Sequence, residues 1–133
     1  MIDLQPTRCN ICGGKVIFTS NAEIYGRPYG SGKCYLCLEC GAYVGTHRPR
    51  PTEALGILAD KQMRDWKIVC HNLFDKLWKG KRHAVRLRRY YYDRLAAELN
   101  IPVSECHFGY FDLPMLLRSY VAVSEIIQED KHA

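Results

Sequence analysis

Two Cys-x-x-Cys pairs constrain this chain more than any other feature of its sequence. The first pair is Cys9 and Cys12, the second is Cys37 and Cys40, and a glycine follows each pair at once. Two residues between paired cysteines let one tight turn present both sulfurs to one metal ion, and four thiolates at about 2.3 Å close a tetrahedron around Zn²⁺. The glycine can adopt the positive φ that such a turn requires. The sequence therefore predicts one structural zinc ion, with no coordination position open for catalysis.

Cys34 offers a second possible pairing, because it precedes Cys37 by the same spacing. The glycine after Cys40 repeats the glycine after Cys12, and this symmetry favours Cys37 and Cys40 as the ligands. Cys34 is then a spare thiol near the metal. The seven cysteines are an odd number, and four of them have ligand spacing, so we expect a reducing cytoplasm and not a disulfide framework.

The residues around the cysteine pairs predict a zinc ribbon over residues 1–50. Short β-prone runs at 16–19 and 43–44 stand beside the two pairs, and the glycines and proline within residues 21–33 predict a connecting loop. Pro49 and Pro51 then form a stiff crossing, because each proline fixes its own φ and restricts the residue before it.

The remaining residues, 51–133, predict a three-helix bundle. Apolar side chains recur at helical spacing from Asp60 to Trp78, from Lys81 to Leu99 and after Asp112, where Pro114 is tolerated in the first turn. We therefore expect an α+β chain in which the ribbon packs on the bundle to form one compact unit. No stretch approaches the roughly 20 apolar residues of a membrane span, so we expect no membrane partner.

The net charge of +5 is concentrated in the middle of the chain. Residues 1–60 carry +1, residues 61–100 carry +7 and residues 101–133 carry −3. Such a concentration creates a local positive field that attracts phosphates or an acidic partner. We predict a binding surface for nucleic acid or for a partner protein, made of Lys79, Lys81, Arg82, Arg86, Arg89 and Tyr90.

Three consecutive tyrosines follow these cations. Tyr91 falls on the apolar stripe of the second predicted helix and should pack inward, whereas Tyr90 and Tyr92 flank the stripe and should be freer to stack on bases. A solvated helix face with no partner explains the charges as well as a binding surface does.

A polar cluster is the third candidate site. Arg64, His71 and Asp75 share one face of the first predicted helix, and a carboxylate four residues from an imidazole can fix its tautomer. His47 and His107 would complete a pocket if the fold brought them there. His71 and Asp75 are the residues that a metal-dependent nuclease would use. No catalytic motif accompanies them, so a structural, hydrogen-bonded histidine is the favoured interpretation.

Several short motifs, which include residues other than the cysteines, are distributed along nearly the whole chain. They are Cys-x-x-Cys-Gly-Gly from Cys9, Ile-Tyr-Gly-Arg from Ile24, Gly-Ala-Tyr-Val-Gly-Thr-His up to His47, His-x-x-Phe-Asp-x-Leu-Trp from His71, and Cys-His-Phe-Gly-x-Phe-Asp from Cys106. Their order resembles an uncharacterised zinc-finger-containing domain family of bacteria and their phages. The resemblance implies a protein of the bacterial cytoplasm or of an infected bacterial host. It further implies the metal ligands Cys9, Cys12, Cys37 and Cys40, and a shared role for His47, Arg64, His71, Asp75 and His107.

These features predict a small zinc-binding, non-enzymatic protein that contacts nucleic acid through a basic helix. The alternative is a phage-type adaptor or inhibitor, in which the same cationic helix meets an acidic surface of a host protein. A metal-dependent nuclease is the third hypothesis.

Overall fold

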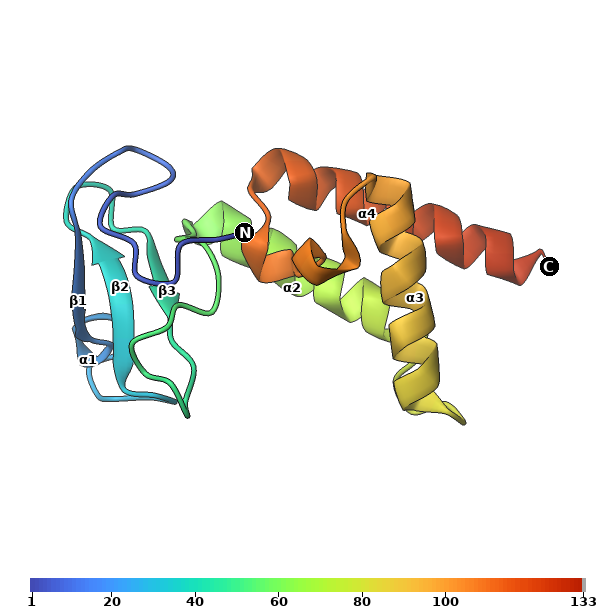
Figure 1. The fold of residues 1–133 in the computed structure, drawn as a ribbon, viewed down its shortest axis with the longest axis horizontal. Helices are drawn as coiled ribbons and strands as arrows, with labels where there is room; N and C mark the ends of the chain where they lie inside the picture. Colours follow the sequence, from blue (N-terminus) through green and yellow to red (C-terminus); the bar gives the residue numbers. More distant parts are fainter. Residues whose placement is uncertain (133) are drawn as a thin grey trace. The chain divides into compact units, whose positions relative to one another are not determined.

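The computed structural model describes residues 1–132, which form two compact units, one ending at Gln62 and the other beginning at Met63. The first unit contains a three-stranded sheet, and the second consists of helices (Figure 1). The combination of a small sheet with helices confirms the predicted α+β class. Among residues 1–132, no helix has the length and apolar character needed to cross a membrane.

The sheet of the first unit is antiparallel with the strand order β1-β2-β3. Its strands are β1 (Val16–Ser20), β2 (Lys33–Cys37) and β3 (Tyr43–Gly45). β1 and β3 lie at the two β-prone runs, whereas β2 was not predicted. The connection from β1 to β2, expected to be a loop, contains the single helical turn α1 (Ala22–Tyr25).

Residues 54–59 extend the first unit beyond the boundary predicted after Arg50. Thr46 forms a β-bridge with Ala54, and Tyr43 forms one with Ala59. Ala54 and Leu58 are buried in the same apolar cluster as residues of the three strands. The prolines after β3 therefore make a turn inside the ribbon, and the chain passes back along the sheet before the first long helix begins.

The helical unit contains the three predicted helices. They are α2 (Lys61–Asp75), α3 (Ala84–Leu99) and α4 (Leu113–Lys131), and two short 3₁₀ turns, η1 (Val103–Glu105) and η2 (Phe108–Tyr110), connect α3 to α4. Asp112 caps α4, because its side chain accepts a hydrogen bond of 3.0 Å from the peptide N–H of Met115. Pro114 lies in the first turn, as predicted.

α2 ends earlier and α3 begins later than the sequence periodicity predicted. At the end of α2 the N–H groups of Lys76, Leu77 and Trp78 form hydrogen bonds that span three residues instead of four, as in the bond of 3.0 Å from Leu77 to the carbonyl of Phe74. Gly80 and His83 then adopt left-handed backbone conformations, with φ of +74° and +60°. Because no regular helix passes through such residues, residues 76–83 form a series of turns.

The aromatic residues of the helical unit meet around Phe74, which is fully buried. Its ring centroid lies 4.3 Å from that of Tyr92 on α3 and 5.8 Å from that of Phe108 in η2. α4 contributes buried Leu116 and Val123 to this unit. These contacts fix the middle of α3 against the end of α2, and thereby position the cationic residues described below.

Candidate metal centre and cationic surface

The two Cys-x-x-Cys turns, here called knuckles, have the same backbone geometry. In the first knuckle the N–H of Gly13 donates to the carbonyl of Cys9, and the N–H of Cys9 donates to the carbonyl of Gly14. The second knuckle repeats both bonds with Cys37, Gly41 and Ala42. Gly13 and Gly41 have φ of +76° and +80°, which confirms the reason for a glycine after each pair.

The four knuckle sulfurs converge to within 4.8 Å of one another. For a metal–sulfur bond of about 2.3 Å, a tetrahedron has sulfur–sulfur edges of about 3.8 Å. The Sγ atoms of Cys9 and Cys40 are 3.7 Å apart, and those of Cys12 and Cys37 are 3.5 Å apart. Both distances join one knuckle to the other, so residues from distant parts of the sequence form a donor set that fits one tetrahedral Zn²⁺.

Backbone N–H groups stabilise the thiolates that a zinc ion requires. Three of them donate to sulfur over 3.3 to 3.4 Å, from Ile11 to Cys9, from Gly14 to Cys12 and from Cys40 to Cys37. Hydrogen bonds lower the pKa of the Cys37 thiol to about 7, and the largest contribution comes from the N–H of Cys40, with a further one from the N–H of Glu39. Because four protein ligands close the coordination sphere, the site is structural, and its binding energy counts as folding energy of the ribbon.

Cys34 lies outside the metal centre. It is buried in β2, where it pairs with Thr19 and Gly45, and burial raises the pKa of its thiol. A strand places neighbouring side chains on opposite faces, so the spacing of three between Cys34 and Cys37 spans extended chain and forms no knuckle. The ligand set is therefore the one that the symmetry of the two glycines favoured.

The predicted binding residues other than Tyr90 lie on an exposed stretch that we call the cationic segment, residues 79–89. Lys79, Lys81 and Arg82 occupy the turns before α3, and Arg86 and Arg89 lie in its first half. All five are exposed, and within residues 1–132 none of them forms a salt bridge. Arg82 is not helical, because α3 begins only at Ala84.

The second half of α3 has its charge neutralised by α4. Arg94 forms a salt bridge of 2.7 Å with Asp130, and its other terminal nitrogen pairs with Glu129. The hydroxyl of Tyr91 donates to the same Asp130 carboxylate. The acidic C-terminal residues therefore neutralise Arg94, and Asp130 also interacts electrostatically with Lys81 of the cationic segment. Arg82, Arg86 and Arg89 form no ion pair within residues 1–132.

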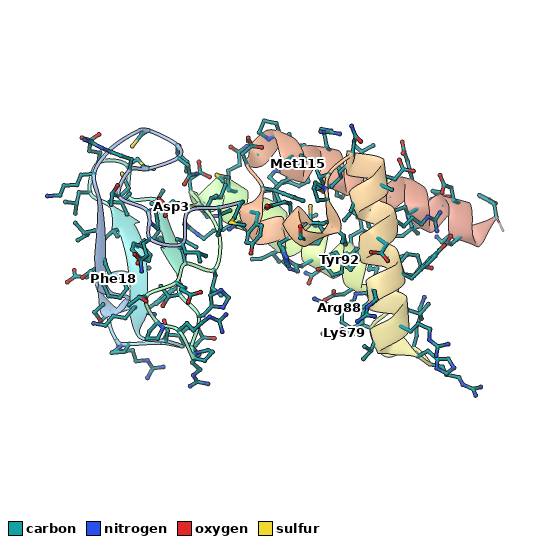
Figure 2. The ribbon with its side chains drawn as sticks, in the orientation of Figure 1. Asp3, Phe18, Lys79, Arg88, Tyr92 and Met115 are labelled. Carbon is teal, nitrogen blue, oxygen red and sulfur yellow. The ribbon has the colours of Figure 1, made fainter. Side chains whose placement is uncertain are left out.

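Arg88 is a site residue that the sequence analysis did not select. Its guanidinium carbon lies 4.8 Å from the ring centroid of Tyr92 and 5.5 Å from that of Trp78. Figure 2 shows Arg88 and Tyr92 on the same side of α3. The i,i+4 spacing of an arginine and a tyrosine was the available signal.

The exposure of the consecutive tyrosines differs in part from the prediction. Tyr90 is exposed, as expected, and its ring touches that of Tyr91. Tyr92, expected to be free, is half-buried because it packs on Phe74, and burial raises the pKa of its phenol. Phe74 therefore covers one face of the Tyr92 ring, and the Arg88 guanidinium also lies over the ring.

His71 and Asp75 of the predicted polar cluster do not form the hydrogen bond that was expected between them. The Nδ1 atom of His71 lies 3.2 Å from the carbonyl oxygen of Lys67, and within residues 1–132 no hydrogen bond links its ring to Asp75. The His71 ring packs edge-on against Phe108, whereas the His107 ring packs against Tyr110. Arg64 lies on α2, and His47 belongs to the first unit.

The comparison with known families agrees with the metal centre. The model of a zinc-finger-containing domain matches residues 5–128, which include all four knuckle cysteines. No curated protein and no solved structure matches the chain. Cys9, Cys12, Cys37 and Cys40 therefore bind one structural zinc ion. The chain belongs to the zinc-finger-containing domain family, as its motifs predicted.

Proposed function

We propose that the chain is a zinc-stabilised, non-enzymatic protein that binds nucleic acid through the cationic segment. The observation that supports this proposal most is the exposed charge of Arg82, Arg86 and Arg89, which form no ion pair within residues 1–132. Arg94, in the second half of the same helix, is by contrast paired with acids. A protein that contacts phosphates needs cations that are not already engaged by its own carboxylates.

The position of these cations opposes the stability of α3. The first turn contains no acidic residue, no side chain caps the helix, and Arg86 lies in that turn. Cations near a helix N-terminus act against the helix dipole, at a cost of roughly 0.3–1 kcal/mol each at an exposed site. A bound phosphate reverses this effect, because it is attracted both by the helix N-terminus and by the side chains. The arrangement therefore favours an anionic, phosphate-bearing partner.

The salt dependence of binding tests the proposal. Fluorescence anisotropy with labelled oligonucleotides, repeated over a series of NaCl concentrations, gives the slope of log K against log [salt]. The slope is about −0.9 per neutralised phosphate on duplex DNA and about −0.7 on single strands. If Arg82 and Arg86 each neutralise one phosphate, Arg82→Gln/Arg86→Gln makes the slope shallower by about 1.8 on duplex and about 1.4 on single strands.

A matched control is available in the ribbon, where Arg27 and Arg48 are also exposed. Arg27→Gln/Arg48→Gln removes the same charge and should leave the slope unchanged. An affinity that does not vary with salt, or an equal effect of the two double variants, contradicts the proposal. Retention of an acidic protein partner after nuclease treatment, with no oligonucleotide binding, would instead support the adaptor alternative.

A further inference from the structure

A groove of about 370 Å³ lies beside the cationic segment, on the side of α3 that faces Trp78 and the residues before η2. Its volume is within the roughly 300–1,000 Å³ of small-molecule sites. Aromatic, aliphatic and charged side chains line it, among them Trp78, Val85, Arg88, Tyr92, Val103 and His107. A mainly apolar wall with a few polar groups suits a flat ligand with apolar faces and polar edges.

Arg88 is held in this groove before any ligand arrives. Its guanidinium lies over both Tyr92 and Trp78, at 4.8 and 5.5 Å from the ring centroids. Tyr92 is itself fixed by its contact with buried Phe74. Cation–π contact with two rings restricts the rotamers of a long side chain, so a ligand that stacks on the guanidinium plane meets an ordered surface.

The charges around the groove favour a base inside it and the phosphates outside it. Asp93 also lines the groove, and its carboxylate repels a phosphate placed there. Arg89 lines this groove and also a neighbouring hollow of about 490 Å³ that includes Arg86. A base in the groove would therefore have its adjoining phosphates beside Arg86 and Arg89, away from Asp93.

We infer that this groove takes one unpaired nucleobase, stacked on Arg88 beside Tyr92, and that the chain consequently prefers single-stranded to duplex nucleic acid. The inference rests on the proposed function. In a duplex both faces of each base are covered by its neighbours, so a base reaches the groove only after unstacking, which costs a few kcal/mol. Unpaired bases stack on arginine planes and aromatic rings without that cost.

The test compares a labelled oligo(dA) single strand with the duplex that it forms with oligo(dT), using anisotropy with the full chain. Arg88→Lys retains the charge but removes the planar group. Because stacking is worth about 1–3 kcal/mol per base, the variant should lose about 5-fold or more of its single-strand affinity. Its duplex affinity should stay unchanged. Arg48→Lys, an equally exposed exchange in the ribbon, should change neither affinity.

A second readout uses tryptophan emission. The chain contains two tryptophans, Trp66 and Trp78, so Trp66→Phe leaves the groove residue as the sole reporter. Single strands should quench its emission and duplex should not. Equal affinity for both substrates, together with an unaffected Arg88→Lys variant, overturns the groove inference and leaves the proposed function standing. Absence of binding to both substrates at low salt overturns both.

Discussion

Replacing a knuckle glycine should strain the backbone and thereby lower the affinity for zinc. Gly41 has φ of +80°, and a Cβ atom built there meets nothing within 4 Å. The only cost of Gly41→Ala is therefore the left-handed backbone of a residue with a Cβ, about 1–2 kcal/mol. Because zinc binding and ribbon folding are coupled, this cost should appear in the zinc affinity.

The expected loss is about 5- to 30-fold in affinity, the factor that corresponds to one to two kcal/mol. Gly41→Asn should lose less, because asparagine tolerates the left-handed region better than alanine does. Gly45→Ala is the matched control, since its backbone is ordinary and the new methyl would lie 3.5 Å from Leu55, at normal contact distance. Gly45→Ala should bind zinc as the parent does.

Competition with a chelator of known affinity measures these constants, with free zinc buffered at each step. The reasoning is refuted if Gly41→Ala retains the parent affinity, or if Gly45→Ala loses as much as Gly41→Ala. Circular dichroism of the zinc-saturated variants checks that each one has reached the same fold before the affinities are compared.

Three further changes test the helical unit, whose urea unfolding can be followed by the emission of its two tryptophans. Phe74→Ala removes a fully buried ring and should cost about 3–5 kcal/mol, and a loss below 1 kcal/mol would contradict its central position. Asp112→Ala removes the cap of α4 and should cost about 1 kcal/mol, while Asp112→Asn retains most of it, and equal midpoints in both variants would argue against the cap. Arg94 and Tyr91 hold the pKa of Asp130 below its ordinary value of 3.8. The stabilisation is therefore present above that value and lost as the pH falls through the lower folded-state pKa. Asp130→Asn should remove this part of the acid dependence, and an unchanged pH profile would count against the ion pair.

The metal centre was predictable from sequence because its determinants are local. Each knuckle is a short turn whose ligand spacing and glycine are visible without knowledge of the fold. The cap at Asp112 was predictable for the same reason, since the caps of helices depend on a few adjacent residues. The three helices also followed from their apolar periodicity.

Features that depend on tertiary contacts were missed. β2 follows the predicted loop and was not predicted as a strand, and its pairing with β1 and β3 depends on residues distant in sequence. Residues 54–59 were assigned to the helical region, but two β-bridges connect them to residues of the first unit. Nothing in the local sequence states that His83 adopts a left-handed conformation, which delays the start of α3.

The groove was missed for a related reason. Tyr92 was expected to be exposed because it flanks the apolar stripe of its helix, but Phe74 from α2 covers one of its faces. Arg88 was not among the predicted binding residues, and its position over two rings depends on Trp78, which lies in a turn outside any helix. Periodicity within one helix does not report contacts with a neighbouring segment.

The most direct test of the account is amide hydrogen exchange, measured by mass spectrometry on the zinc-loaded chain and after chelation. The account predicts one zinc ion per chain, and slow exchange in β1, β2 and β3 that is lost with the metal, while α3 and α4 remain protected. A chain that holds no zinc when isolated, or whose strands stay equally protected after chelation, would contradict the claim that four cysteines and one ion hold the ribbon together.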